Sequence, residues 1–219
     1  KRADPALRVI ILEREFAGFG GSGRNGGWLT GGFAWRHDRY LAAGGREGLR
    51  AMIRAMAGTV DEVAGVAEAE GIEADILRTD EILAAIGPAQ LARARAAVAH
   101  RLSFDVPEDR VRLLDESEAR ARLDIPGMSG AMLVENVARV QPARLVRGLA
   151  EVVVRMGVEI CEGSPVTAIA PGRATTPGGS VSAPIILRAT EGFTAGLPGA
   201  RREWLPLNSA QVITAPLSL

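Results

Sequence analysis

The chain has 219 residues, 47% of them hydrophobic and 24% charged, and its 26 basic and 26 acidic residues give a formal net charge of zero. This is ordinary globular composition, and the length suits one large domain or two small ones. The sequence shows no basic patch for nucleic acid, no apolar run near the roughly 18 residues that span a bilayer, and no signal peptide. The single cysteine, Cys161, excludes an internal disulfide and a zinc cluster, so a cytoplasmic setting is expected.

An apolar run near the N-terminus, V-I-I-L at residues 9–12, is followed at once by Glu13. An unbroken run of β-branched and aliphatic residues predicts a strand that is buried on both faces, as in a parallel sheet. Ligands of open α/β sheets bind at the carboxyl ends of the strands. In a dinucleotide-binding unit, an acid at this place binds the ribose hydroxyls. The alternative is an ordinary solvated acid at a strand end.

A glycine-rich stretch follows, and G-F-G-G-S-G at residues 18–23 matches the motif G-x-G-x-x-G. In the usual dinucleotide fingerprint this motif opens a helix and precedes the acid by about 20 residues. Here the acid comes before the motif, and N-G-G-W-L-T-G-G at residues 25–32 does not predict a helix. We therefore interpret the stretch as a loop against a cofactor, with the fingerprint strand expected upstream of Lys1. A flexible surface loop is the alternative.

Helices and strands then alternate along the chain. Apolar residues at spacings of three and four predict a helix over residues 46–70 that ends at Gly71. Residues 72–86 predict one or two strands, and Pro88 begins a helix to about His100. Residues 111–114 form a short predicted strand. Asp115, with Glu118 three positions later, predicts a capping box on a helix that runs to Leu123.

The second half of the chain predicts a strand over residues 128–135 and a helix from Pro142 to Met156 that ends at Gly157. Short strands are expected at residues 158–162, 166–170, 174–175, 181–182 and 185–189. A last strand is expected at residues 214–219.

Glu13 followed by Gly-Phe-Gly-x-Ser-Gly-Arg-Asn-Gly-Gly-Trp resembles the FAD-dependent oxidoreductases of the D-amino-acid oxidase (DAO) type, closest to the gamma-glutamylputrescine oxidoreductase-like amine oxidases. Further similar segments are Q-P-A-R-L at 141–145, G-V-E-I at 157–160, S-P-V at 164–166 and R-A-T-E-G-F-T at 188–194. The resemblance covers nearly the whole chain, most weakly between Gly71 and Arg122.

The resemblance implies a mixed α/β fold, an incomplete FAD-binding Rossmann-like domain with part of a substrate domain. Residues 1–45 would be a partial FAD-binding domain, residues 46–139 a helical and substrate-domain segment, residues 140–195 the return to the FAD-binding domain, and residues 196–219 the start of the substrate-domain sheet. The fingerprint strand and the C-terminal part of the enzyme would lie outside these 219 residues.

The resemblance also implies where FAD is bound. Glycines let backbone N–H groups approach an anion or a flavin closely. The backbone at Val166 would lie against the adenine, and the Ala189 turn beside the phosphates, although an ordinary strand-to-loop exit is an alternative for that turn. The predicted cofactor-binding residues are Glu13, Arg14, Ser22, Gly23, Arg24, Asn25, Gly26, Gly27, Val166, Ala189 and Thr190.

No Ser/His/Asp set, metal-ligand spacing or P-loop lysine can be assembled, and His37 and His100 are interpreted as non-catalytic. This fits flavin chemistry, in which the cofactor accepts the hydride and the protein binds and orients. The resemblance implies oxidation of a C–N bond of a small amine or amino acid, with an imine product and O₂ as the expected acceptor. A flavin dehydrogenase of the same fold, or a non-catalytic, self-associating fragment, is the alternative. Catalytic residues are not assigned.

The 219 residues alone are expected to be inactive and to retain no FAD, because in the family the pyrophosphate rests on the helix after the first strand. A partly disordered loop at residues 20–27 and a homo-oligomer are also expected, since an open sheet edge pairs with other chains.

Overall fold

The computed structural model describes residues 1–33, 37–203, 205, 207, 210 and 215. The chain divides into two compact units: unit 1 comprises Lys1–Gly26 and Val146–Leu219, and unit 2 comprises Gly27–Leu145. Unit 1 contains a parallel strand pair and a small antiparallel sheet, and unit 2 contains a larger antiparallel sheet. The predicted mixed α/β fold is therefore confirmed.

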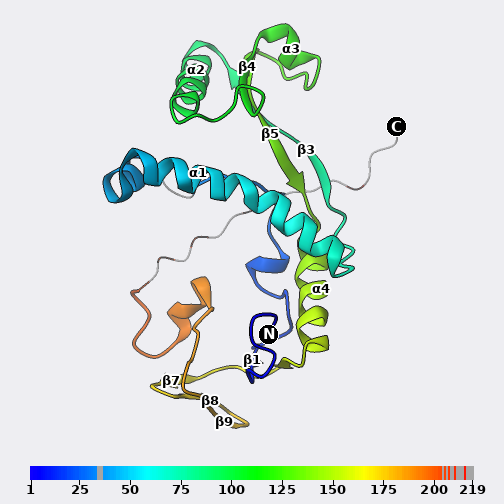
Figure 1. The fold of residues 1–219 in the computed structure, drawn as a ribbon, viewed down its shortest axis with the longest axis vertical. Helices are drawn as coiled ribbons and strands as arrows, with labels where there is room; N and C mark the ends of the chain where they lie inside the picture. The colour runs from blue at the N-terminus through cyan, green and yellow to red at the C-terminus, as the bar shows by residue number, and fades with distance from the viewer. Residues whose placement is uncertain (34–36, 204, 206, 208–209, 211–214, 216–219) are drawn as a thin grey trace. The chain divides into compact units, whose positions relative to one another are not determined.

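The sheet of unit 2 is built around β5 (Met128–Arg139), which is longer than the predicted strand. One edge of β5 pairs with β3 (Leu77–Ile86), and the other pairs with β4 (Val111–Leu114) and β2 (Trp28–Leu29), all antiparallel. Figure 1 shows β3 and β5 running side by side. The stretch predicted as one or two strands is thus a single ten-residue strand that begins at Leu77.

A hydrophobic core lies at the N-terminal end of β5, next to α2 (Pro88–Leu102), β4 and α3 (Glu116–Arg120) (Figure 1). Burial of these side chains stabilises the end of the sheet by the hydrophobic effect. The buried members of the core cluster are Leu114, Ala119, Met128, Ala131 and Leu133.

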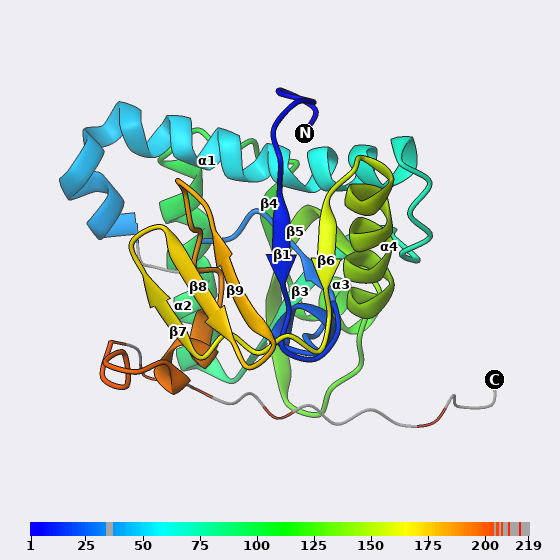
Figure 2. The same cartoon turned by 90° about the horizontal axis from the view of Figure 1, so that it is seen from below.

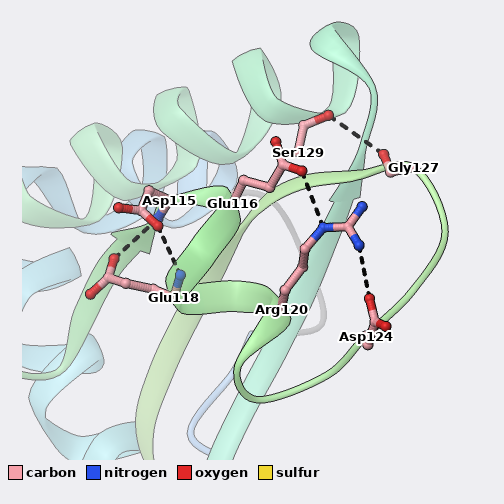
Figure 3. Close-up of polar contacts among 7 residues, drawn as sticks. All are labelled: Asp115, Glu116, Glu118, Arg120, Asp124, Gly127 and Ser129. Carbon is pink, nitrogen blue, oxygen red and sulfur yellow. Dashed lines mark hydrogen bonds and ion pairs between the residues drawn. The ribbon is translucent and has the colours of Figure 1, made fainter.

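The predicted capping box begins α3 (Figure 3). An Asp115 carboxylate oxygen accepts from the Glu118 N–H at 2.8 Å, and the Glu118 carboxylate accepts from the Asp115 N–H at 3.1 Å. Arg120 then pairs with Glu116 and Asp124. The helix ends at Arg120, earlier than predicted, and the turn after it is mixed: the Ala119 carbonyl accepts from the Arg122 N–H at 3.1 Å and from the Leu123 N–H at 2.9 Å.

The long helix α1 (His37–Ala69) is broken at Gly45, where φ is 64° and ψ is −174°. The part after the break matches the predicted helix and buries Leu49, Val60 and Ala67. Its end is a Schellman motif at Gly71, whose φ is 68°. The Gly71 N–H donates to the Glu68 carbonyl and the Ile72 N–H donates to the Ala67 carbonyl at 2.8 Å.

Unit 1 contains the strand pair predicted from the N-terminal run. β1 (Ile10–Leu12) lies parallel to β6 (Glu159–Cys161), as Figure 2 shows. The predicted burial of β1 on both faces is wrong, since Ile10 is 37% exposed and Ile11 41% exposed. In the part of the chain that the structure describes, β6 is the only strand that pairs with β1, so its other edge has no strand to cover it.

Helix α4 (Pro142–Arg155) begins at the predicted proline and is followed by Gly157, whose φ is 81°. After β6, the strands β7 (Ala168–Ala170), β8 (Arg173–Thr176) and β9 (Gly179–Ser182) form a three-stranded antiparallel meander (Figure 2).

The strand predicted at residues 185–189 is absent. Ile185 is 75% exposed and Leu187 is 86% exposed, and no described strand pairs with this segment. An apolar run becomes a strand only when neighbouring strands accept its backbone hydrogen bonds. The strand predicted at residues 214–219 lies outside the described residues, apart from Ala215.

Candidate cofactor site

Glu13 lies directly after the carboxyl end of β1, where the sequence predicted it. Its N–H donates to the Cys161 carbonyl at 2.9 Å, and its carbonyl accepts from the Ser164 N–H at 2.8 Å. One carboxylate oxygen accepts from the Glu15 N–H at 3.0 Å. No salt bridge joins this carboxylate to a cation among the described residues. The negative charge is therefore available to a hydroxyl-bearing ligand.

Arg14 follows Glu13 and is exposed. Its exposed guanidinium pairs with the Glu15 carboxylate at 3.2 Å. Arg14 is therefore next to Glu13 in the sequence, but the ion pair that its side chain makes is with Glu15.

Glu162 was not predicted as a site residue, yet it organises the same edge of the strand pair. Its Oε1 accepts from the Ala17 N–H at 2.8 Å and from Arg147 Nη1 at 3.2 Å. Since Leu12 pairs with Cys161, Glu162 follows β6 as Glu13 follows β1. An acid directly after a second predicted strand is the sequence signal that could have identified it.

The glycine-rich loop is folded tightly on itself. A Cβ on Gly23 would lie 2.0 Å from the Gly18 carbonyl oxygen, and a Cβ on Gly18 would lie 2.6 Å from Val146 Cγ1. In contrast, a Cβ on Gly21 would meet nothing within 4 Å. Two of the motif glycines are therefore required by packing inside the protein, and Gly21 presents its backbone to open space.

Arg24 and Asn25 stabilise this loop with their own side chains. Arg24 lies over the Phe19 ring at 4.2 Å from the centroid and donates to the Phe19 carbonyl. The Asn25 side-chain amide donates to the carbonyls of Gly21 and Ser22, each at 3.1 Å. The loop forms a 3₁₀ turn, η1 (Gly21–Gly23), and the partial disorder expected of residues 20–27 stays a prediction. Ser22 is exposed on this turn.

Gly26 and Gly27 lie at the boundary of the two units. Gly27 is buried with φ of 71°, and a Cβ there would lie 2.2 Å from the Val140 carbonyl oxygen. Its carbonyl accepts from the Val140 N–H at 2.8 Å. Gly27 therefore serves packing within unit 2, whereas Gly26 is exposed at the end of unit 1.

The predicted residues Ala189 and Thr190 precede a second 3₁₀ turn, η2 (Glu191–Gly196). Ala189 is exposed, and Thr190 Oγ1 lies 2.7 Å from Thr194 Oγ1. A Cβ on Gly20 would lie 3.1 Å from the Phe193 ring, so η2 packs against the glycine-rich loop. The structure thus brings these two predicted segments together.

Val166 is half-buried between β6 and β7. Two residues before it, the Ser164 N–H donates to the Glu13 carbonyl at 2.8 Å. This bond holds the segment that contains Val166 next to the end of β1.

A hollow of about 560 Å³ lies between α4 and β6. It is lined by Arg147, Ala150, Glu151, Val154, Arg155, Ile160 and Glu162. None of these is a predicted cofactor residue, so the hollow is separate from the Glu13 carboxylate.

The residues of unit 1 fit one half of an FAD molecule. A carboxylate without a cationic partner at the end of a parallel strand suits ribose hydroxyls. The open backbone at Gly21 suits close approach of a ligand, because no Cβ intervenes.

Two other kinds of site find no support. In the part of the chain that the structure describes, no group of three or more His, Cys, Asp or Glu residues could hold a metal ion. Among those residues there is also no helix that is long and apolar enough to cross a membrane.

The sequence and the structure were compared with those of known proteins, and the similar proteins are oxidoreductases, oxidases and dehydrogenases by name. Probable oxidoreductase OrdL from Haemophilus influenzae is 26% identical over 232 residues, which cover 99% of this chain and 52% of that protein. Among solved structures, glycine oxidase from Geobacillus kaustophilus matches with a TM-score of 0.68 and 21% identity over 89% of this chain and 51% of that chain. L-proline dehydrogenase from P. horikoshii matches with a TM-score of 0.61 and 14% identity over 88% and 55%.

The solved structures are too distant in sequence to show more than the fold, and the chain spans about half the length of these relatives. The family model described as "FAD dependent oxidoreductase", DAO, however, matches residues 2–219. This match confirms the resemblance that begins with Glu13 and the glycine-rich loop. The chain belongs to the DAO family of FAD-dependent oxidoreductases.

Proposed function

We propose that this chain supplies the adenosine side of the FAD site in an oxidoreductase that acts on a C–N bond of an amine or amino acid. The single observation that carries the proposal is the Glu13 carboxylate, which lies at the end of a parallel strand without a cationic partner among the described residues, in a chain of the DAO family. The bound flavin would accept a hydride from the substrate.

The described residues would bind and orient the cofactor. Glu13 would accept hydrogen bonds from the ribose hydroxyls, and the exposed backbone at Gly21 and Ser22 would face the phosphates or the flavin. Val166 and the Ala189–Thr190 turn would add main-chain contacts.

The remaining predicted residues would act by shaping the loop. Gly23, Arg24 and Asn25 hold the 3₁₀ turn in place. Arg14, Gly26 and Gly27 border it at either side.

The substrate class is supported by the names of the matched structures, a glycine oxidase and an L-proline dehydrogenase, which act on amino acids. Loss of a hydride from the carbon next to nitrogen, together with a proton from that nitrogen, would give an imine, which water would convert to a carbonyl compound with release of ammonia or an amine. With O₂ as the electron acceptor the second product would be hydrogen peroxide. The similarity to a dehydrogenase favours a second candidate, in which the electrons pass to another acceptor.

The proposal keeps residues 1–45 and 140–195 as parts of the FAD-binding domain, residues 46–139 as the helical and substrate-domain segment, and residues 196–219 as the start of the substrate-domain sheet. A cytoplasmic setting is part of it, supported by the single cysteine. Homo-oligomer formation is also part of it, supported by the exposed isoleucines of β1.

The test is anaerobic reduction of the flavin in the purified full-length enzyme. Amines and amino acids should bleach the flavin absorbance, and O₂ should restore it with release of hydrogen peroxide if the enzyme is an oxidase. Matched compounds with a hydroxyl in place of the amino group serve as controls. Bleaching by the hydroxyl compounds alone would contradict action on a C–N bond, and recovery only with an artificial acceptor would favour the dehydrogenase.

A further inference from the structure

The segment after β1 is joined by hydrogen bonds to the segment after β6. Main-chain bonds run from the N–H groups of Glu13, Gly163 and Ser164 to the carbonyls of Cys161, Glu15 and Glu13, at 2.9, 2.9 and 2.8 Å respectively. A side chain makes the next contact, in which Glu162 Oε1 accepts from the Ala17 N–H at 2.8 Å. Of these contacts, the one at Ala17 is nearest to Gly18, where the glycine-rich loop begins.

Helix α4 holds the Glu162 carboxylate and also packs on the loop. The helix lies beside β6 (Figure 2), and Arg147 Nη1 donates to the same Oε1 of Glu162 at 3.2 Å. The preceding residue, Val146, lies so close that a Cβ on Gly18 would be 2.6 Å from its Cγ1. Successive residues of α4 therefore locate the start of the loop, Val146 by packing and Arg147 through Glu162.

The start of the loop in turn locates the 3₁₀ turn η1. A Cβ on Gly23 would lie 2.0 Å from the Gly18 carbonyl oxygen, so the backbones of these two residues are in contact. The Gly23 N–H donates to the Gly20 carbonyl at 3.2 Å and closes the turn. Gly21 and Ser22, which are exposed on η1, therefore take their position from Gly18.

We propose that Glu162 is a positioning residue for FAD, which holds the glycine-rich loop where one FAD molecule can contact both the loop and Glu13. This inference rests on the proposed function, in which Glu13 binds the ribose and η1 faces the phosphates or the flavin. Glu162 acts through Ala17 and does not itself contact FAD. The role requires a hydrogen-bond acceptor at the end of a side chain of this length, and it does not require a negative charge.

The effect on FAD binding follows from the fraction of molecules in which the loop is in place. The apparent affinity for a ligand falls in proportion to the fraction of the protein that is competent to bind it. Loss of the Ala17 bond lowers that fraction. The side chains of Arg147 and Glu162 are 50% and 43% exposed, so their ion pair contributes little to overall stability. The consequence of removing Glu162 is thus expected in FAD affinity more than in unfolding.

Titration of the full-length apoenzyme with FAD tests the role, with variants that separate the acceptor from the charge. Glu162→Gln keeps the acceptor and the length, and its affinity should stay within about twofold of the parent. Glu162→Asp keeps the charge on a shorter side chain, and Glu162→Ala removes both. Each of these two should weaken FAD binding by about threefold to tenfold, as the loss of one hydrogen bond does. The control is Glu159→Ala, which removes an exposed acid of β6 itself and should leave the affinity unchanged.

Two further measurements separate positioning from a general loss of stability. Hydrogen exchange of the Ala17 amide in the apoenzyme should be slow in the parent and in Glu162→Gln, and faster in Glu162→Asp. Visible circular dichroism at saturating FAD should differ from the parent in Glu162→Asp and not in Glu162→Gln, because a displaced loop changes the surroundings of the flavin. Glu162→Asp gives the answer if Glu162→Ala does not fold.

The outcomes distinguish this role from the proposed function, since the titration needs no substrate. Parent-like affinity in Glu162→Asp and Glu162→Ala, with weakened binding in Glu13→Ala, would overturn the positioning role alone. Unchanged affinity in Glu13→Ala would overturn the Glu13 site and this role with it. Equal weakening in Glu162→Gln and Glu162→Asp would show that the charge matters, and it would overturn positioning through Ala17.

Discussion

At the scale of single residues, Glu13 is the side chain whose role in cofactor binding is most directly testable. A charged hydrogen bond contributes about 1.5–3 kcal/mol. Glu13→Ala in the full-length enzyme should therefore weaken FAD binding by about tenfold to a hundredfold. The measurement is FAD titration of the apoenzyme. Glu15→Ala is the matched control: it removes a neighbouring carboxylate that pairs with Arg14, keeps the Glu15 N–H that donates to Glu13, and should leave the affinity nearly unchanged. Equal affinity in Glu13→Ala and the parent would remove Glu13 from the site.

The glycines of the loop allow a matched pair of substitutions. An alanine at position 23 would place Cβ 2.0 Å from a backbone oxygen, whereas an alanine at position 21 would meet nothing within 4 Å. Gly23→Ala should thus destabilise unit 1 by about 1–3 kcal/mol, as overpacking does, and Gly21→Ala should leave stability nearly unchanged. Urea denaturation distinguishes them. If FAD approaches the open side of the turn, Gly21→Ala should weaken FAD binding without loss of stability.

At the scale of elements, the capping box of α3 should contribute measurably to unit 2. Asp115→Ala removes the acceptor of the Glu118 N–H and should cost about 1 kcal/mol of unfolding free energy. The control is Asp124→Ala, which removes only an exposed ion pair with Arg120 and should cost between about 0 and 1 kcal/mol. A larger loss in the control than in Asp115→Ala would show that the cap does not stabilise the helix.

Elements with local signals could be predicted from the sequence, and elements that depend on a partner could not. Pro142, Gly71 and the Asp115 box mark helix ends by local backbone chemistry, and the structure has helix ends there. The apolar run at residues 185–189 also looked like a strand, but strand formation depends on neighbours that residue patterns do not reveal.

The candidate site shows the same division between local and distant contacts. The position of Glu13 followed from a short run of residues, because a strand and its final acid are adjacent in sequence. The roles of Arg24 and Asn25 did not, since the bonds of their side chains to the loop carbonyls depend on how the loop folds back. The contact of His37 Nδ1 with His100 Nε2 at 3.0 Å requires α1 and α2 to meet, and no spacing along the chain encodes it.

At the scale of the whole molecule, each unit is a compact body, and the two differ in their sheets: unit 1 contains the parallel β1–β6 pair and a small antiparallel sheet, whereas the sheet of unit 2 is antiparallel around β5. The two strands of the parallel pair are short, and their stability depends on burial by further elements. The antiparallel sheet of unit 2 carries its own buried core at the end near α3. Unit 2 is therefore expected to be the more stable of the two in denaturation.

The exposed apolar surface of unit 1 leads to the last prediction, that these 219 residues alone self-associate and do not retain FAD. Ile10 and Ile11 of β1 are exposed, and the second edge of β1 has no partner strand among the described residues. An open edge with apolar side chains pairs readily with another chain. Light scattering should show dimers or larger species, and added FAD should be lost on gel filtration.

A charge on this strand provides the control for that prediction. Ile11→Lys should reduce association, because charged side chains on an edge strand oppose pairing with another chain. This variant leaves Glu13, the acid predicted to bind FAD, unchanged. We nevertheless expect that it does not retain FAD, whether or not it is monomeric. A monomer at tens of micromolar that holds stoichiometric flavin would contradict both parts of the prediction, and it would mean that unit 1 binds FAD without a further strand beside β1.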